Sequence, residues 1–227
     1  MTLLGLLAAT GSKMGREVYT LMKQEFGEVE EPVPPGTVGS STMPQKRNPK
    51  LSQDIVAAAA QVRALVPLAL EAMQTEHEAD RTTSMMFDRA MTEACGLTGD
   101  ILQRLIVLFS GLQVFPERMR QNLELSGGLI MAEALMLELG KRIGRQRAHD
   151  AVYDAAQAAV TRDRPFQEML AGDARVGAQL TPAQVTELLD PARYTGLCRQ
   201  FAEEGAVRAR GTVAQLARAG FNPPPTS

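Results

Sequence analysis

Aromatic residues are scarce in this chain of 227 residues: they make up 4% of it, and tryptophan is absent. The apolar positions are filled instead by Ala, Leu and Met, which favour packed helices over sheets. Hydrophobic residues still amount to 44%, so the chain can bury a large core as one domain or as two small ones. We therefore expect an all-α protein.

Cysteine is almost as scarce. Cys95 and Cys198 are the two cysteines, and their spacing matches neither a metal site nor a disulfide framework. Because both lie in helical patterns, we expect them to be small buried hydrophobes in a reducing compartment. We predict no metal and no cofactor.

The sequence also lacks a strong charge and a long apolar run. Its formal net charge is −2, which gives no general attraction to nucleic acid or to a membrane surface. No uninterrupted apolar stretch is long enough to span a bilayer, and no cationic region precedes the apolar N-terminus as in a signal peptide. We predict a cytoplasmic protein without nucleic-acid or membrane partners.

Three long helices are predicted, over residues 1–26, 50–77 and 82–109, from apolar side chains at helical spacing. Gly5, Gly11 and Gly15 would each weaken an isolated helix by about 1 kcal/mol relative to Ala. We therefore expect these glycines at close contacts with a neighbouring helix. Apolar faces this wide predict an extended bundle, in which the long helices pack against one another and against other subunits.

Shorter helical patterns follow Gly111 and predict a second domain. They cover residues 116–125, 129–139, 145–160, 166–170, 182–189 and 196–219. We assign residues 1–110 to a central bundle that includes a loop at 30–49, residues 111–221 to a smaller C-terminal helical domain, and residues 222–227 to a disordered, proline-rich tail. No strand pattern is evident.

The loop between the first two long helices carries the candidate chemistry. It ends in Gly39-Ser40-Ser41-Thr42-Met43-Pro44-Gln45-Lys46-Arg47-Asn48-Pro49. Ser40 and Ser41 offer hydroxyls, Lys46 a compact positive charge, and Asn48 an amide that can hold a carboxylate oxygen. A helix that starts after Pro49 would add free N–H groups and a positive partial charge. These residues predict a carboxylate-binding loop; the alternative is a capped helix entry with solvated cations.

This loop closely resembles the signature of the fumarase/aspartase superfamily, G-S-S-x-M-P-x-K-x-N-P, with every fixed position met. Its Lys-Arg-Asn-Pro sequence is similar to that found in the branch that holds adenylosuccinate lyase and 3-carboxy-cis,cis-muconate cycloisomerase. The likeness extends over residues 1–35 and 50–160, and residues 161–197 are most similar to the cycloisomerases. The family's N-terminal domain has no counterpart, so the chain looks like the C-terminal half of a member. We expect it to be incomplete and inactive alone.

The resemblance implies a long-helix bundle, a homotetramer with active sites shared between subunits, and a small dicarboxylate or tricarboxylate substrate. Ser40 occupies the position of the base that removes a proton from the carbon beside a carboxylate, after which a C–N or C–O bond breaks. Lys46 and Asn48 match carboxylate-binding positions. The positions that close over substrate are matched by Ser41, Thr42 and Met43.

One departure from the family pattern bears on the branch. Adenylosuccinate lyases and fumarases place a Glu five residues beyond the signature Asn, where this chain has Gln53. The cycloisomerases of the branch also lack that Glu. His77 is flanked by carboxylates, and such a His is more often a solvated helix end than a catalyst, but adenylosuccinate lyases have a similar His-Glu stretch here. We therefore expect a cycloisomerase-like enzyme, with adenylosuccinate lyase as the alternative and an inactive helical oligomerisation fragment as a third.

Overall fold

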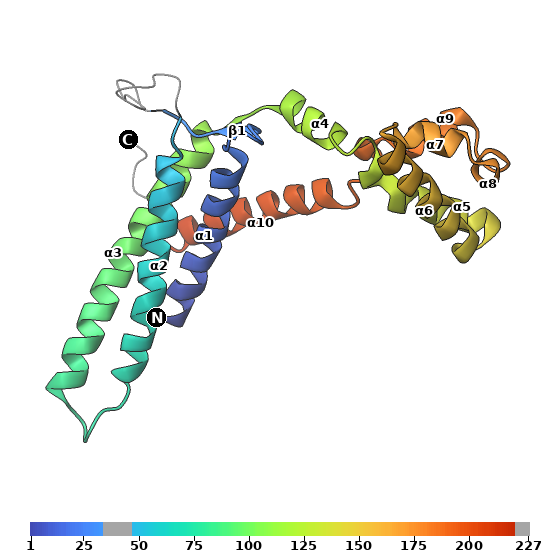
Figure 1. Cartoon of the computed structure of the whole chain (residues 1–227). Coiled ribbons are helices and arrows are strands. Elements are labelled where there is room, and N and C mark those ends of the chain that lie inside the picture. Colours follow the sequence, from blue (N-terminus) through green and yellow to red (C-terminus); the bar gives the residue numbers. More distant parts are fainter. Residues whose placement is uncertain (34–46, 221–227) are drawn as a thin grey trace. The chain divides into compact units, whose positions relative to one another are not determined.

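The computed structural model describes residues 1–33 and 47–220, and its fold is helical, as the sequence predicts. The chain forms two compact units, residues 1–122 and 123–227 (Figure 1). The division lies after Asn122, so that helix α4 (Pro116–Glu124) belongs mainly to the first unit. Arg118 Nε and Asn122 Nδ2, both on α4, donate to the Phe26 carbonyl at 2.7 and 2.9 Å.

The first unit contains α1 (Thr2–Leu21), β1 (Val29–Glu30), α2 (Lys50–Glu71), α3 (Arg81–Gly111), β2 (Gln113–Val114) and α4 (Pro116–Glu124). The second contains η1 (Leu129–Met131), α5 (Ala132–Ile143), α6 (Arg145–Arg162), α7 (Phe166–Ala171), α8 (Ala174–Gly177), α9 (Pro182–Leu188), η2 (Pro191–Arg193) and α10 (Cys198–Arg218). The sequence patterns did not predict the two short strands or α8, and they extended α1 and α2 too far.

Helices α1, α2 and α3 pack side by side in the first unit, and glycines bring them close together (Figure 1). Gly5, Gly11 and Gly15 are all buried on α1. A Cβ atom added at Gly5 or Gly11 would lie 3.0 Å from the side chain of Val66 or Ile101. The predicted close contacts are therefore confirmed, and they explain why residues that weaken an isolated helix stand in this one.

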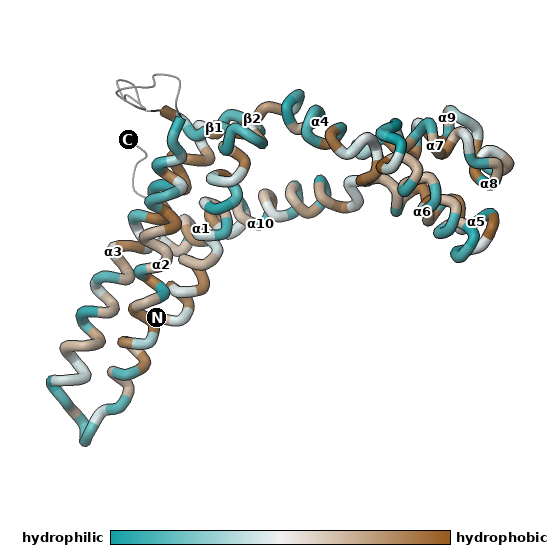
Figure 2. Tube along the Cα trace, viewed as in Figure 1, coloured by the Kyte–Doolittle hydropathy of each residue, from teal (hydrophilic) through white to brown (hydrophobic). Residues whose placement is uncertain are grey.

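Helix α2 is long and apolar enough, by length and composition, to cross a membrane. In the first unit, however, its Ile55, Ala59 and Val62 are fully buried and belong to the core shared with α1 and α3. Bands of apolar residues recur along these helices in Figure 2. The apolar face of α2 thus serves the helix bundle.

The second unit has its own core, formed by α5, α6, α7 and α9. Leu135, Leu139, Phe166 and Leu170 are almost completely buried there. Helix α9 begins with a capping box at Thr181, whose side chain accepts from the backbone N–H three residues on. This local signal explains why the start of α9 was predictable.

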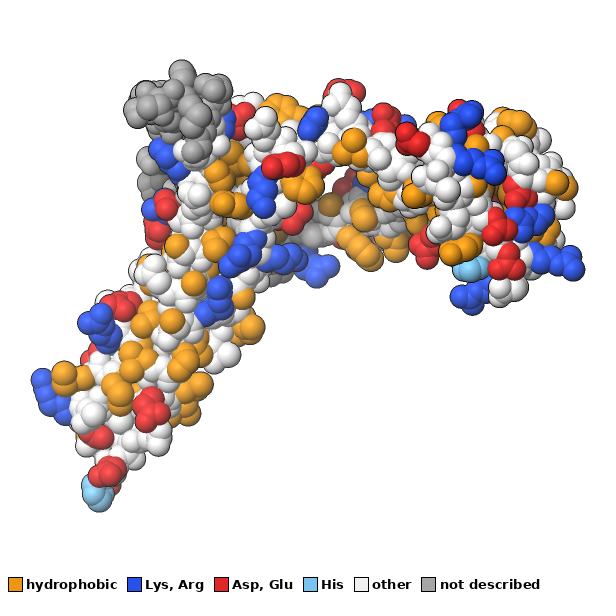
Figure 3. Space-filling view, in the orientation of Figure 1, with side chains coloured by type: hydrophobic (Ala, Val, Ile, Leu, Met, Phe, Trp, Pro, Cys, Tyr) orange, Lys and Arg blue, Asp and Glu red, His pale blue; other side chains and the backbone are white. Residues whose placement is uncertain are grey.

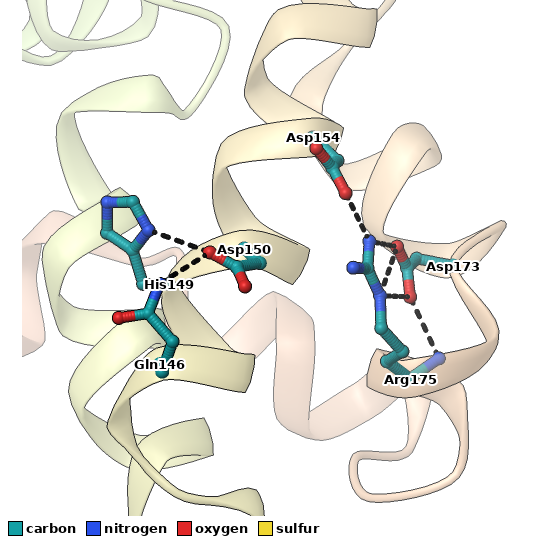
Figure 4. Close-up of polar contacts among 6 residues, drawn as sticks. All are labelled: Gln146, His149, Asp150, Asp154, Asp173 and Arg175. Atoms are coloured by element: carbon teal, nitrogen blue, oxygen red, sulfur yellow. Dashed lines mark hydrogen bonds and ion pairs between the residues drawn. The ribbon is translucent and has the colours of Figure 1, made fainter.

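An ion-pair network joins α6 to α8 in this unit (Figure 4). The Arg175 guanidinium lies 2.8 Å from the Asp154 carboxylate and 2.6 Å from that of Asp173. Asp173 also caps α8 by accepting from the Arg175 N–H at 2.8 Å. The hydrogen bond from the Arg175 side chain holds the pKa of Asp173 below its ordinary value. Elsewhere on α6, Asp150 accepts from Gln146 at 2.9 Å, on an exposed face.

Both cysteines are exposed, so the prediction that they are buried is wrong. Cys95 follows the fully buried Ala94 on α3, and one residue turns a helix by about 100°, which carries Cys95 off the core face. Cys198 is the first residue of α10, all of whose residues are exposed in this chain.

Large apolar side chains remain exposed on the long helices of the first unit (Figure 3). Leu3 on α1 is 80% exposed and Met85 on α3 is 60% exposed, and Met73, in the turn after α2, is 76% exposed. Other large apolar residues of α1–α3 with high exposure are Leu6, Leu70, Leu102, Ile106 and Phe109.

A substitution at Gly111, the last residue of α3, tests how closely this helix end packs against Pro32. A Cβ added there would lie 2.6 Å from Cβ of Pro32, which is too close for two carbon atoms. We expect Gly111→Ala to lower the free energy of unfolding by about 1–3 kcal/mol, because Pro32 and the helix end must move apart.

The matched control is Gly99→Ala on the same helix, where an added Cβ meets nothing within 4 Å. It should raise stability by roughly 0.5–1 kcal/mol, the ordinary gain of Ala over Gly in a helix. Urea unfolding of the two variants measures both effects, and equal behaviour of the two would contradict the contact with Pro32.

Candidate functional site

Asn48 is the candidate site residue that the structure describes. It is half-buried, and its carbonyl accepts from the Lys50 N–H at 2.8 Å immediately before α2. Pro49 is the N-cap of α2, so the helix starts after it as expected. The other candidates lie outside the described residues: Ser40, Ser41, Thr42, Met43 and Lys46.

A cavity of about 230 Å³ lies at the start of α2. Residues 30–33 and 47–48 of the loop at 30–49 contribute to its walls. Its walls come from the end of α1, from the segment after β1, from the first turn of α2 and from α3. The lining residues are Met22, Glu30, Glu31, Pro32, Val33, Arg47, Asn48, Lys50, Leu51, Asp54 and Arg104.

Most charges around this cavity are paired with one another. Arg47 Nε lies 3.0 Å from a Glu30 carboxylate oxygen. Arg104 lies 2.7 Å from Asp54 and 2.8 Å from Asp100, and the hydrogen bond to Asp100 is the main cause that raises its pKa.

Glu31 is a residue of this cavity that the sequence patterns missed. It is 4% exposed, and its two carboxylate oxygens accept from the backbone N–H groups of Leu51 at 3.0 Å and Ser52 at 2.8 Å. The expectation that the start of α2 offers free N–H groups to a ligand is therefore wrong for these two groups. No local spacing signals this contact, because Glu31 lies 20 and 21 residues before its partners.

The segment that enters the loop is held from its other side as well. Strands β1 and β2 pair antiparallel, with Val29 opposite Val114 and Glu30 opposite Gln113. The Asn122 side chain on α4 donates to a Glu28 carboxylate oxygen at 2.7 Å. These contacts fix residues 28–30, directly before Glu31.

Two further residues of interest lie away from any described cluster of chemical groups. Gln53 is exposed on the first turn of α2. His77 is exposed in the turn between α2 and α3, with a positive φ of 59°. Among residues 1–33 and 47–220, no group of three or more His, Cys, Asp or Glu side chains is arranged to hold a metal ion.

Comparison with known proteins bears on the whole chain. The family model described as Lyase matches residues 1–64, and the one described as Adenylosuccinate lyase C-terminus matches residues 128–204. A 3-carboxy-cis,cis-muconate cycloisomerase of Pseudomonas aeruginosa is 40% identical over 224 residues, which are 99% of this chain and 47% of that protein. An N-acetyl-S-(2-succino)cysteine lyase of Enterococcus italicus is 37% identical over 89% of this chain and 45% of its own length.

Solved structures with a similar fold come from the same group of enzymes. The crystal structure of 3-carboxy-cis,cis-muconate lactonizing enzyme from Pseudomonas putida matches with a TM-score of 0.81 and 37% identity, over 89% of this chain and 45% of that one. The chain spans about half the length of the curated relatives that it matches. By its signature loop, its helical fold and these matches, the chain belongs to the fumarase/aspartase superfamily, in the branch that holds 3-carboxy-cis,cis-muconate cycloisomerase and adenylosuccinate lyase.

Proposed function

We propose that this chain provides the signature loop and helical scaffold of a lyase or cycloisomerase that adds or eliminates across a C–C bond beside a carboxylate. Its substrate is a small dicarboxylate or tricarboxylate, and its reaction is most like that of 3-carboxy-cis,cis-muconate cycloisomerase. The observation that carries the proposal is the complete signature at residues 39–49, in a chain 40% identical to such an enzyme.

In this proposal Ser40 is the base. A serine hydroxyl is a weak base, so its alkoxide and the developing aci-carboxylate need fixed positive charge and hydrogen-bond donors. Lys46 supplies the charge and Asn48 the amide donor, while Ser41, Thr42 and Met43 close over the substrate. The Leu51 and Ser52 N–H groups are occupied by Glu31, so these two donors make no contribution.

Adenylosuccinate lyase is the second candidate, and the match of residues 128–204 to the C-terminus of that family favours it. The neutral Gln53 argues for the cycloisomerase. A third candidate is an inactive helical fragment that only assembles with other subunits. We place the protein in the cytoplasm, as expected for enzymes of small carboxylates.

A pair of chimaeras separates these candidates. In each, this chain replaces the matching part of a complete enzyme, either the Pseudomonas aeruginosa cycloisomerase or an adenylosuccinate lyase. We expect turnover of 3-carboxymuconate by the first chimaera and little turnover of adenylosuccinate by the second, each followed by absorbance.

The 227-residue chain alone should turn over neither substrate, because neither of its histidines, His77 and His149, matches the family's general acid. The parent enzymes are the controls. Activity in the second chimaera alone would favour adenylosuccinate lyase. Folded but inactive forms of both would favour the assembly fragment.

Serine substitutions in the active chimaera test the assignment of the base. Ser40→Ala should lower kcat by at least ~10²-fold, the usual scale of a lost acid–base group. Ser41→Ala should be milder. Lys46→Ala should raise KM and also lower kcat, because the same charge faces substrate and aci-carboxylate. Near-full kcat in Ser40→Ala together with loss in Ser41→Ala would reverse the assignment within the pair.

Assembly is the last part of the proposal: a homotetramer formed by side-by-side packing of the long helices. It would cover the exposed apolar side chains of α1–α3, among them Leu3, Leu70 and Met85. Light scattering at micromolar concentration should give the mass of a tetramer. Met85→Asp should shift the mass toward monomer, and Val160→Asp, at a residue of the second unit that is 68% exposed, should not. A stable, soluble monomer of the unmodified chain would contradict the proposal.

A further inference from the structure

Two consecutive glutamates before the signature loop contact Arg47, near the end of that loop, and the first turn of α2 after it. Successive side chains of an extended segment point in opposite directions, so Glu30 and Glu31 reach different partners. Glu30 pairs with Arg47 at 3.0 Å, and Glu31 accepts from the Leu51 and Ser52 N–H groups. Both ends of the loop are thereby tied to each other at the cavity.

The two ties differ in burial and therefore in strength. The Arg47 and Glu30 side chains are 49% and 27% exposed, so water screens their attraction. Glu31 is 4% exposed, and a carboxylate at that depth is costly unless hydrogen bonds replace its lost water. The first turn of a helix offers N–H groups without intrahelical partners and a positive partial charge, which meet this need.

We propose that Glu31 is a positioning residue for the reaction proposed above, on which this inference rests. Its carboxylate fills the N-terminus of α2 and fixes the distance between the loop's two ends, so that Asn48 is held at the cavity. It also closes that helix end to other anions. The substrate carboxylate is then bound by side chains such as that of Asn48, and not by the Leu51 and Ser52 N–H groups.

The chemistry of the contact explains why Glu is required. Gln has the same length but a single acceptor oxygen, so one of the two N–H groups would face an NH₂ group. Glu31→Ala removes a CH₂–COO⁻ group, which is nearly the size of acetate. Added acetate can therefore occupy the vacated helix terminus and accept from each N–H group with a separate oxygen, whereas chloride at the same ionic strength is a single atom that fills less of the vacated space.

The test is amide hydrogen exchange at Leu51 and Ser52 in the full 227-residue chain. Glu31→Ala should make both amides exchange at least ~10-fold faster, and acetate but not chloride should restore most of the protection. Glu31→Gln should accelerate exchange less and should not respond to acetate, because its side chain fills the space. The control Glu30→Ala removes the same charge one residue earlier and should leave both amides protected.

Unchanged exchange in Glu31→Ala, or equal effects of acetate and chloride, would overturn the proposal. If Glu31→Ala does not fold, Glu31→Gln decides in the same way: unchanged protection of both amides counts against it. These readings need no catalytic activity, so they stand whether or not the proposed function does.

A kinetic measurement in the active chimaera separates positioning from a merely structural cap. Glu31→Gln should raise KM for the carboxylate substrate several-fold more than it lowers kcat, because it displaces the binding residue Asn48. A KM equal to that of the parent chimaera would overturn the positioning role. No turnover in the unmodified chimaera would instead count against the proposed function, with the exchange result still deciding whether Glu31 fills the helix end.

Discussion

A carboxylate buried away from water needs hydrogen-bond donors, and the first turn of a helix has N–H groups that lack acceptors. In this chain the Leu51 and Ser52 N–H groups at the start of α2 donate to the Glu31 carboxylate. The buried carboxylate thereby gains donors, and the two N–H groups gain acceptors. The loop at 30–49 contains Glu31 near its start and ends directly before α2. This contact therefore fixes the position of Glu31 relative to the first turn of α2.

The remainder of the first unit supports that contact from several directions. Glycines on α1 allow α2 and α3 to approach closely, which fixes the helix whose end Glu31 occupies. The β1–β2 pair and the α4 side chains hold the segment just before Glu31, and Gly111 leaves space for Pro32 just after it. The long helix bundle thus holds in place the polar contact between Glu31 and the first turn of α2.

Family membership and substrate choice rest on different parts of the molecule. Two relatives of similar identity, 40% and 37%, bear the names of a muconate cycloisomerase and of an N-acetyl-S-(2-succino)cysteine lyase. Proteins this similar to one chain can therefore bear the names of different enzymes, so identity at this level does not decide the substrate.

Local patterns in the sequence determined the all-α class, the long helices, the close-packed glycines of α1 and the capped start of α9, because each depends on residues within a few turns of one another. The loop at 39–49 was identifiable in the same way. Only the tertiary structure decided that Glu31 fills the start of α2, that Cys95 is exposed and that α4 attaches to the turn at Phe26. Those features depend on contacts between residues 20 to more than 90 positions apart, or on which side of a helix faces the core, and no local spacing encodes either.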